Sequence, residues 1–533
     1  MEVKKNKYLL ENKRWVFSSF IFSILILLPV LVLLINFFSG DQTTLNYLFN
    51  TVLFDYSLNT FYLILLTSIT ALVMGIFPAW VISNYNFYGR KFFDIALYLP
   101  LAIPAYIMAF TYIDILNYTG PFQTFLRNYS FLPSDFFNVD YLQIETLGIL
   151  LGLSLYPYVY TASRISFSLI GSNYINVSKN LGLSTLQTFY KVILPLSRPA
   201  IISGLFLVIM EVLNEYGAVK YFGVNTFTSG IFRSWFSLGD INGAIQLACI
   251  LLIFVLLLFY LEKKSLKNSQ FYYSKNSDVF SRKLKKTSKP LLAYFMCIIP
   301  FLFGFILPVL FIINNTFHTF SETNFPKLFD LIGNSIFVST FSAIFIIAIA
   351  LFLLFVNRIS KIKSLSFINN LVSLGYALPG AVIGLGLILL FSSNSLVGSF
   401  LILFYAYIIR FLAVGKSPIK SSIEKQPESF DDTGKNLGLG PFKLLKQIHL
   451  PINKFALISA FIVAFIDILK ELPITLILSP FNFDTLATQT YEFAVEEMLP
   501  LSSIYSLIII VLGSLMLLIL KNYIDKQINV SKS

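Results

Sequence analysis

Charged residues are scarce in this chain of 533 residues, where Asp, Glu, Lys and Arg together make up 12% of the sequence. Soluble proteins carry about 25% charged residues. Hydrophobic residues make up 56% and aromatic residues 17% of the chain. A composition this poor in charge argues against a soluble globular protein and predicts a chain embedded in a lipid bilayer.

Cysteine and histidine are nearly absent, with two of each. Cys249 and Cys297 both lie in apolar runs, which is typical of small buried hydrophobic residues. His318 and His449 are isolated, and no group of His, Cys, Asp and Glu has the spacing of a zinc site. The sequence therefore argues against a metalloenzyme, and we assign no metal ligand.

A nucleotide-binding P-loop is also missing. Gly415, Lys416 and Ser417 match the end of that motif, but Arg410 occupies the position of its first glycine. No nucleophile elbow or catalytic triad pattern occurs. We therefore expect no enzymatic activity and no cofactor in this chain.

Long apolar runs dominate what is present. A spanning helix needs about 20 apolar residues. Such runs predict an all-α polytopic membrane protein with about twelve transmembrane helices at 15–38, 57–83, 92–116, 146–170, 197–219, 242–261, 291–313, 334–356, 367–391, 395–415, 455–479 and 501–521. The first run is longer than the apolar region of a signal peptide and lacks a small-residue cleavage site, so we expect it to be retained.

Basic residues mark the predicted cytoplasmic side. Five of them lie within the first 14 residues, and nine accompany a single acidic residue between Lys263 and Lys289. Six predicted spans separate these two segments, so both fall on one side, which the positive-inside rule makes cytoplasmic. The segments 38–56 and 480–500 contain no Lys or Arg and are expected outside. The net charge of +12 thus reflects topology, and no nucleic-acid partner is expected.

The two halves of the chain are copies of one another. Asn59 and Pro104 correspond to residues 275 positions later, and positions 179–215 match 435–471 at twelve of 37 positions with an offset of 256. The first half is longer by 19 residues, the difference between 275 and 256, mostly in a predicted outside loop at 117–145. We expect a first repeat at 1–262, a basic cytoplasmic linker at 263–290 and a second repeat at 291–533. Because each half begins and ends inside, the repeats are parallel, related by an axis along the membrane normal.

A polar stretch between spans is conserved between the two copies. In the first copy, Gly182 is suited to the left-handed turn that ends a helix, and Ser184 with Gln187 forms a capping box that predicts the start of a short helix. Pro195 is expected to mark the break between this short helix and the next span. In the second, Pro441 begins the short helix and Pro451 marks the break. Such helices can also simply lie at the membrane interface.

These stretches resemble the cytoplasmic EAA loop of the permease subunits of ABC importers. The shared pattern is Gly, nine residues, an aliphatic residue, any residue and Leu-Pro, found here as Gly182, Val192, Leu194 and Pro195, and again as Gly438, Ile448, Leu450 and Pro451. The start of the motif departs from Glu-Ala-Ala, and only Asp432 keeps the acidic residue. The resemblance implies that both loops are coupling helices that dock on an ATPase subunit.

Two further stretches, 221–240 and 469–500, are similar to the fused permeases of bacterial ferric-iron importers. This resemblance implies a protein of the bacterial cytoplasmic membrane with both termini inside. It would work by alternating access with two copies of an ABC ATPase, which carry the ATP and magnesium, and with one extracellular or periplasmic iron-binding protein. Thiamine or another small solute is the alternative cargo, and an ion-driven secondary transporter is the alternative class.

Four acidic residues are the candidates for the translocation path. Glu215 and Glu471 occupy equivalent positions, and Glu211 and Asp467 lie one turn earlier. Alternatively, these carboxylates lie near the outer ends of their spans, solvated or paired with Lys470 or Lys220. Aromatic walls would suit thiamine, but Leu472 occupies the position in the second repeat that Tyr216 occupies in the first.

Overall fold

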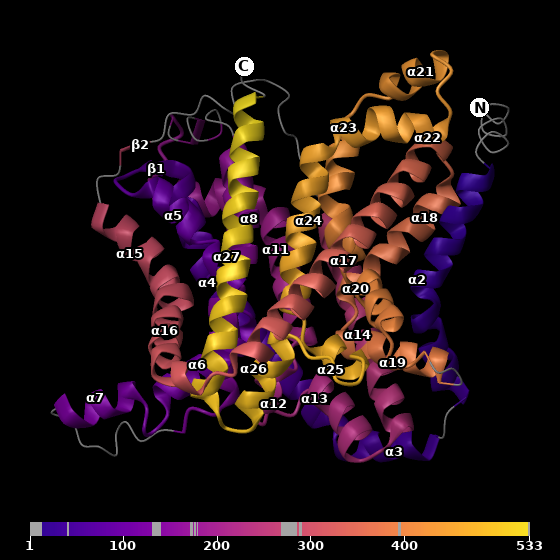
Figure 1. The fold of residues 1–533 in the computed structure, drawn as a ribbon. Coiled ribbons are helices and arrows are strands. Elements are labelled where there is room, and N and C mark those ends of the chain that lie inside the picture. Colours follow the sequence, from indigo (N-terminus) through magenta and orange to yellow (C-terminus); the bar gives the residue numbers. More distant parts are fainter. Residues whose placement is uncertain are drawn as a thin grey trace.

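The computed structural model describes residues 13–39, 42–129, 140–170, 174, 177–178, 180–267, 285–286, 290–392 and 396–530. Most of these residues are helical, and each predicted span coincides with a helix or with two helices separated by a break (Figure 1). The all-α polytopic fold is therefore confirmed. The linker predicted at 263–290 lies largely outside the described residues.

The first repeat contains α2 (Lys13–Ser39), α3 (Gln42–Thr51), α4 (Leu53–Asn84), α5 (Arg90–Ala96), η1 (Leu99–Ala102), α6 (Ala105–Leu116), α7 (Pro121–Tyr129), α8 (Ile144–Leu169), α10 (Thr185–Thr188), η3 (Phe189–Ile193), α11 (Leu194–Asn214), α12 (Gly217–Tyr221), α13 (Phe227–Phe232), η4 (Arg233–Ser237) and α14 (Ile241–Lys267). One short parallel pairing joins β1 (Tyr85–Asn86) to β2 (Lys285–Lys286).

The second repeat contains α15 (Pro290–Phe301), η6 (Leu302–Ile306), α16 (Leu307–Thr319), η7 (Phe320–Glu322), α17 (Phe325–Ser360), α18 (Lys363–Val372), η8 (Ser373–Ala377), α19 (Gly380–Phe391), α20 (Phe400–Glu424), α21 (Ser429–Asn436), α22 (Pro441–Leu444), η9 (Leu445–His449), α23 (Leu450–Ile452), α24 (Lys454–Leu469), α25 (Pro473–Leu478), α26 (Leu486–Val495) and α27 (Leu499–Val530).

Fewer than twelve helices qualify as uninterrupted spans. Among the described residues, eight helices are long and apolar enough to cross a membrane, and two bent pairs raise the number to ten. The two remaining predicted spans fall on α8, whose tyrosines and serines reduce its apolar character, and on α18 to α19, which η8 interrupts. The difference from twelve therefore lies in one polar helix and one broken span.

Each repeat is built on closely packed long helices. In the first repeat α8 packs along α4 and α11, and in the second α20 packs along α17 and α24. Small residues permit the close approach, because a Cβ added at Gly152 of α8 would lie 2.4 Å from the Cβ of Thr70 on α4. Small residues are typical of helix contacts within membranes.

The first helices of the two repeats are exchanged. Helix α2 packs against α17, α18 and α19 of the second repeat, while α15 packs against α4 and α5 of the first (Figure 1). Trp15 stacks on Phe352 with ring centroids 5.7 Å apart, and the Ser23 hydroxyl donates to Asn369 Oδ1 at 3.2 Å. The repeats are thus intertwined.

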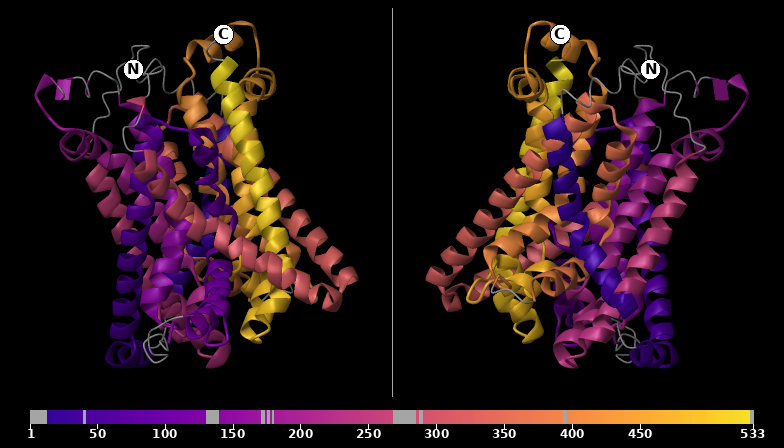
Figure 2. Two further views of the ribbon diagram at one scale, coloured as in Figure 1. Left: turned by 90° about the vertical axis from the view of Figure 1, so that its left-hand side faces the viewer. Right: turned by 90° about the vertical axis from the view of Figure 1, so that its right-hand side faces the viewer.

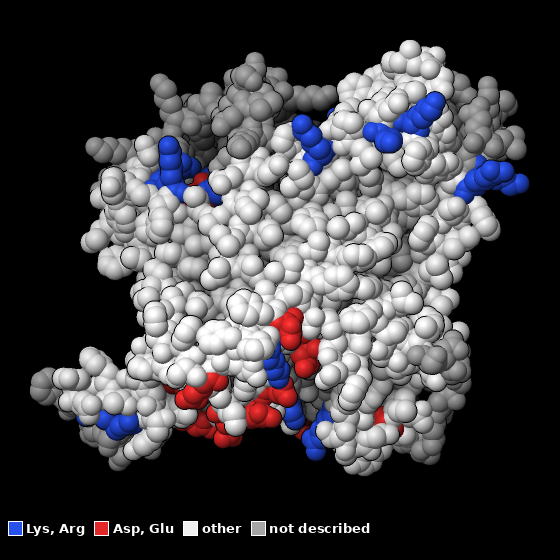
Figure 3. Space-filling model, viewed as in Figure 1, with Lys and Arg blue, Asp and Glu red and all other residues white. Residues whose placement is uncertain are grey.

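The two ends of the protein differ in charge. The start of α2 and the end of α27 lie at the same end as α21, α22 and α23 (Figures 1 and 2). Blue Lys and Arg side chains mark this end, whereas red Asp and Glu side chains gather toward the opposite end (Figure 3). By the positive-inside rule the basic end is expected in the cytoplasm, and the orientation of the termini stays a prediction.

Candidate translocation site and coupling loops

A narrow cavity lies where broken helices of both repeats meet. It is about 50 Å³ in volume, room for only a few water molecules. Its lining includes the break between α11 and α12, the break between α24 and α25, and the start of α6. Helices interrupted at a polar site are typical of transporters, where the freed backbone groups can face the cargo.

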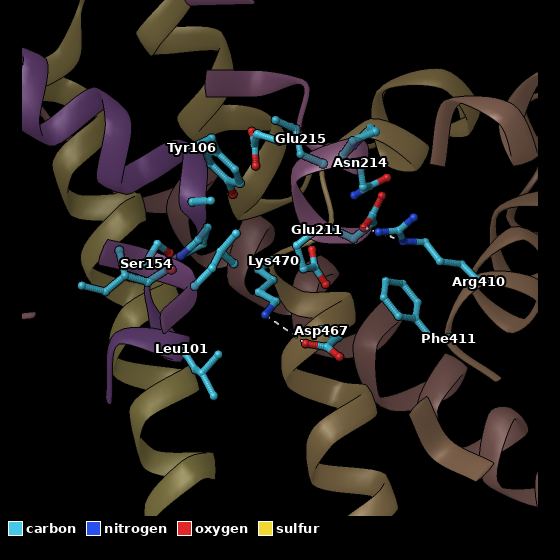
Figure 4. A pocket seen from close by; sticks show the side chains of 17 residues that line it. Leu101, Tyr106, Ser154, Glu211, Asn214, Glu215, Arg410, Phe411, Asp467 and Lys470 are labelled. Carbon is cyan, nitrogen blue, oxygen red and sulfur yellow. Dashed lines mark hydrogen bonds and ion pairs between the residues drawn. The ribbon is translucent and has the colours of Figure 1, made fainter. Parts of the chain in front are cut away.

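All four predicted path carboxylates line this cavity (Figure 4). Glu215 and Glu471 occupy the two breaks, and they make equivalent contacts. Glu215 Oε1 accepts from the Ala218 amide at 2.9 Å, and Glu471 Oε1 accepts from the Ile474 amide at 3.2 Å. Ala218 and Ile474 also differ by 256 positions, so the equivalence of Glu215 and Glu471 extends to their hydrogen-bond donors.

Two cations from the second repeat, the buried Arg410 and the half-buried Lys470, balance part of this negative charge. Arg410 Nε lies 3.2 Å from Glu471 Oε2, with side-chain exposures of 2% and 5%. Lys470 Nζ lies 2.9 Å from Asp467 Oδ1. The sequence left open that the carboxylates pair with Lys470 or Lys220. Lys470 does form such a pair, with Asp467, whereas Lys220 is exposed.

Two hydrogen bonds cross from the first repeat to the second at the cavity. Tyr376 of η8 donates its hydroxyl proton to Glu211 Oε1, and the Gly380 amide donates to Asn214 Oδ1 at 2.7 Å. A Cβ added to Gly380 would lie 3.0 Å from Glu471 Oε1, so the glycine permits the close approach. These contacts join the repeats across the site.

Sequence reasoning missed Arg410, Asn214 and Tyr376 as site residues. Arg410 drew attention only as a departure from a P-loop. Extending the offset of 256 to α8 and α20 would have paired Arg410 with Ser154, and both line the cavity. The signal was therefore present in the repeat, but the contact between the repeats needed the structure.

Aromatic side chains gather next to the cavity. Tyr216 stacks on Phe232 with ring centroids 3.6 Å apart and an interplanar angle of 16°. The Tyr491 ring lies 5.8 Å from that of Tyr216 and 6.5 Å from that of Phe110. The comparison of Tyr216 with Leu472 alone therefore understated the aromatic character of this region.

The first predicted coupling loop has the expected local structure. Gly182 has φ of +78°, a left-handed conformation that favours glycine. Ser184 and Gln187 form the capping box, with the Gln187 amide donating to Ser184 Oγ at 3.3 Å and the Ser184 amide donating to Gln187 Oε1 at 2.9 Å. Phe189 anchors the loop against Trp80, with ring centroids 4.8 Å apart. Asn176, at the motif's start, lies outside the described residues.

The predicted helix break at Pro195 is wrong. Residues Thr185–Asn214 form one continuous helical stretch that includes Leu194 and Pro195. The π-helical turn η3 ends at Ile193, and the equivalent π-helical turn η9 ends at His449 before Pro451, so the turn alone does not decide whether the helix breaks. In the second repeat the break occurs, with a bend of 77° between Pro441–Ile452 and Lys454–Leu469, just after Leu450 and Pro451.

The second loop is held by a buried polar cluster. Gly438 has φ of +77°, like its counterpart. Asp431 Oδ2 lies 2.5 Å from Arg358 Nε of α17, and Asp431 Oδ1 lies 2.7 Å from His449 Nε2. Burial alone would raise the pKa of Asp431, but the hydrogen bonds from His449 and Arg358 outweigh it and lower that pKa. Asp432, next in the chain, is exposed.

Equivalent apolar side chains of the two loops face outward. Leu181 and Leu437 are 75% and 74% exposed, and Leu186 and Phe442 are 70% and 64% exposed. Each pair is separated by 256 positions. Matching exposed apolar side chains at two places on one end of a protein are typical of surfaces that bind a partner.

No resident metal centre is evident in the described part of the chain, where no group of three or more His, Cys, Asp or Glu side chains could hold a metal ion. Cys249 and Cys297 are buried and unbridged, as expected.

Comparisons with known proteins place this architecture in a family. The model of the binding-protein-dependent transport system inner membrane component matches residues 71–263 and again 361–530. The Fe(3+)-transport system permease protein FbpB 2 of Haemophilus influenzae is 26% identical over 479 residues, covering 88% of this chain and 90% of that protein.

Shorter relatives match over one part of the chain. The sulfate transport system permease protein CysT of Salmonella typhimurium is 28% identical over 29% of this chain and 53% of its own length. The molybdenum transport system permease protein ModB of Haemophilus influenzae is 27% identical over 29% of this chain and 65% of its own length. With the family model matched in both repeats, the chain belongs to the inner membrane components of binding-protein-dependent transport systems and is a multi-pass permease of an ABC importer.

Proposed function

We propose that this permease imports ferric iron delivered by an iron-binding protein outside the membrane. The observation that carries the proposal is the charge of the central cavity, where four carboxylates face two cations and leave an excess of two negative charges. Carboxylate oxygens suit hard cations. The iron permease of Haemophilus influenzae supports this cargo, because its similarity extends over both repeats.

The partners follow from the two loops. We infer that each loop docks on one of two copies of an ABC ATPase, which bind ATP and magnesium. Leu181, Leu186, Leu437 and Phe442 supply the exposed apolar contacts. The motif residues Gly182, Leu194, Pro195, Asp432, Gly438, Leu450 and Pro451 give each loop its shape or its polar contact. Both termini and both loops then face the cytoplasm of a bacterial cell.

Alternating access explains how the closed cavity would work. The hydrogen bonds of Glu211 with Tyr376 and of Asn214 with Gly380 join the repeats across the site. Closure of the ATPase dimer would move both loops and separate the repeats at these contacts. The cargo could then enter from outside, and ATP hydrolysis would restore the closed state.

Uptake of ⁵⁵Fe by the complete importer tests this proposal. We expect Glu215→Gln combined with Glu471→Gln to depress uptake much more than either change alone, because each repeat contributes one carboxylate. Glu262→Gln is the matched control, since Glu262 lies on α14 away from the cavity and bonds to Ser203. Normal iron uptake by the double variant would remove both carboxylates from the path.

Thiamine is the second candidate cargo, and the stack of Tyr216 on Phe232 beside Tyr491 favours it. An aromatic organic cation could lie against such rings. Uptake of labelled thiamine, but not of iron, by the unaltered importer would reject the iron proposal and establish this alternative.

A further inference from the structure

The polar residues of the cavity differ between the repeats in a systematic way. At the offset of 256, Ser154 corresponds to Arg410 and Asn214 to Lys470, so the second repeat supplies both cations. At the offset of 275, Tyr106 corresponds to Ala381, so the phenol of Tyr106 has no counterpart in the second repeat. The cavity thus has both cations on the side of the second repeat, whereas Glu215 and Tyr106 lie on the side of the first.

Both carboxylates of the second repeat at the cavity are already paired with cations. Glu471 lies 3.2 Å from Arg410, and Asp467 lies 2.9 Å from Lys470. Glu215 of the first repeat has no such partner among the described residues, and its carboxylate accepts a backbone amide hydrogen bond at 2.9 Å. Of the two equivalent glutamates, Glu215 is therefore the one free to bind a cation in this closed state.

Tyr106 is a second, independent indication of a ligand. Its side chain is 3% exposed, and its hydroxyl has no hydrogen-bond partner within the described part of the chain. The hydroxyl points into the cavity beside Glu215 (Figure 4). A buried hydroxyl without a partner is costly, and the burial of this one at the transport site is explained if a cargo supplies the missing contact.

We propose that Glu215 and Tyr106 form a cation-binding half-site in the first repeat, which holds an oxygen-preferring metal cation as it passes between the repeats. Arg410 and Lys470 neutralise the carboxylates of the second repeat and keep the closed site from binding the ion too tightly. Glu471 becomes available only when Arg410, which lies in the same repeat, releases it. This inference rests on the proposed transport of ferric iron and names the residues that contact it.

The test is a variant that lacks only the hydroxyl oxygen of Tyr106. Tyr106→Phe keeps the ring and deletes only the hydroxyl, and because that hydroxyl has no partner, folding should not suffer. Tyr156→Phe is the matched control, because Tyr156 is fully buried, its hydroxyl also has no partner among the described residues, and it does not line the cavity. Both variants should reach the membrane and unfold at the temperature of the unaltered protein.

With the complete importer in proteoliposomes, Tyr106→Phe should lower the maximal rate of ⁵⁵Fe uptake by at least about tenfold, since a hydrogen bond or ligand contact to a charged group is lost. Tyr156→Phe should change that rate by less than twofold. When ferric iron binds, it replaces the proton of the Tyr106 hydroxyl, and that proton passes to solvent. A readout independent of transport is therefore the visible phenolate-to-iron charge-transfer band, measured with ferric nitrilotriacetate added to the purified permease–ATPase complex. The band should appear with the unaltered protein and with Tyr156→Phe, and be absent from Tyr106→Phe.

The outcomes separate this inference from the proposed function. Iron uptake by the unaltered importer together with normal uptake by Tyr106→Phe would overturn the half-site and leave iron transport standing. Absence of iron uptake by the unaltered importer would overturn both. Equal losses in Tyr106→Phe and Tyr156→Phe would also overturn the half-site, because loss of a buried hydroxyl in general would then explain the effect.

Discussion

Replacing Asp431 by Asn should destabilise the second coupling loop while keeping its shape. The carboxylate accepts from Arg358 at 2.5 Å and lies 2.7 Å from His449, and the side chains of Arg358 and Asp431 are only 12% and 10% exposed. Removing one partner of a buried ion pair costs about 3 to 5 kcal/mol, because the remaining charge stays buried. Arg358 also donates to the carbonyl oxygens of Ile423, Gln426 and Pro427, so we expect a cost of about 3 kcal/mol, the lower end of this range.

The chain provides a matched control close by. Lys361 and Glu428 form an ion pair of similar length, 2.6 Å, but their side chains are 52% and 71% exposed. Exposed pairs contribute about 0 to 1 kcal/mol, so Glu428→Gln should change stability little. Thermal unfolding of the purified permease at one scan rate compares the two variants. Equal effects of Asp431→Asn and Glu428→Gln would refute the view that burial gives the Asp431 cluster its strength.

The dependence of stability on pH provides a second test of the cluster formed by Asp431, Arg358 and His449. Hydrogen bonds lower the pKa of Asp431 below its usual value, so its contribution to stability is present above the ordinary Asp pKa of about 4 and is lost as the pH falls through the lowered pKa. The Asn variant should lack this part of the acid dependence. ATPase activity stimulated by the binding protein should fall together with the stability of the loop, because Asp431 fixes the start of the coupling segment to α17.

Other tests address the loops and the topology. Gly182→Val or Gly438→Val should strain the left-handed turns by about 1 to 2 kcal/mol. Transport and stimulated ATPase activity should then fall while the protein stays in the membrane, and normal transport with the ATPase bound would contradict the docking role. Ser184→Ala should cost about 1 kcal/mol by removing the capping box, seen as a lower unfolding temperature; an unchanged temperature would argue against its importance. Reporters fused near Lys526 should indicate the cytoplasm and one inserted within 117–145 the outside; a cytoplasmic signal from the latter would contradict the topology.

Local features of the loops could be predicted because they depend on neighbouring residues. Gly182 and Gly438 take the left-handed turn, and Ser184 with Gln187 forms the capping box, as their types and spacing indicated. The break predicted at Pro195 was wrong although a break occurs just after Pro451. Equivalent π-helical turns precede both prolines, so neither the proline nor the turn decides where the helix bends.

The composition of the site could be predicted only in part. Duplication identified Glu215 and Glu471, whose local surroundings are repeated along with them. Arg410 escaped notice because its partner Glu471 lies 61 positions away and the equivalent position in the first repeat holds Ser154. Tyr376 escaped notice because its partner Glu211 lies 165 positions away and the equivalent position holds Leu101. The contact of Arg410 depends on how α20 packs against α24 within one repeat, and the contact of Tyr376 depends on how the two repeats approach one another. Periodicity along one helix specifies neither.

The exchange of α2 and α15 has a consequence for how the two halves are held as one particle. Each half buries a helix of the other, as in a domain-swapped dimer, so packing alone should keep the halves together once they have assembled. The covalent connection would then act mainly during assembly, by raising the effective concentration of one half around the other to about the millimolar range. A chain cut between the repeats after assembly should remain a single complex, as would be expected of a protein derived from two separate subunits by gene fusion.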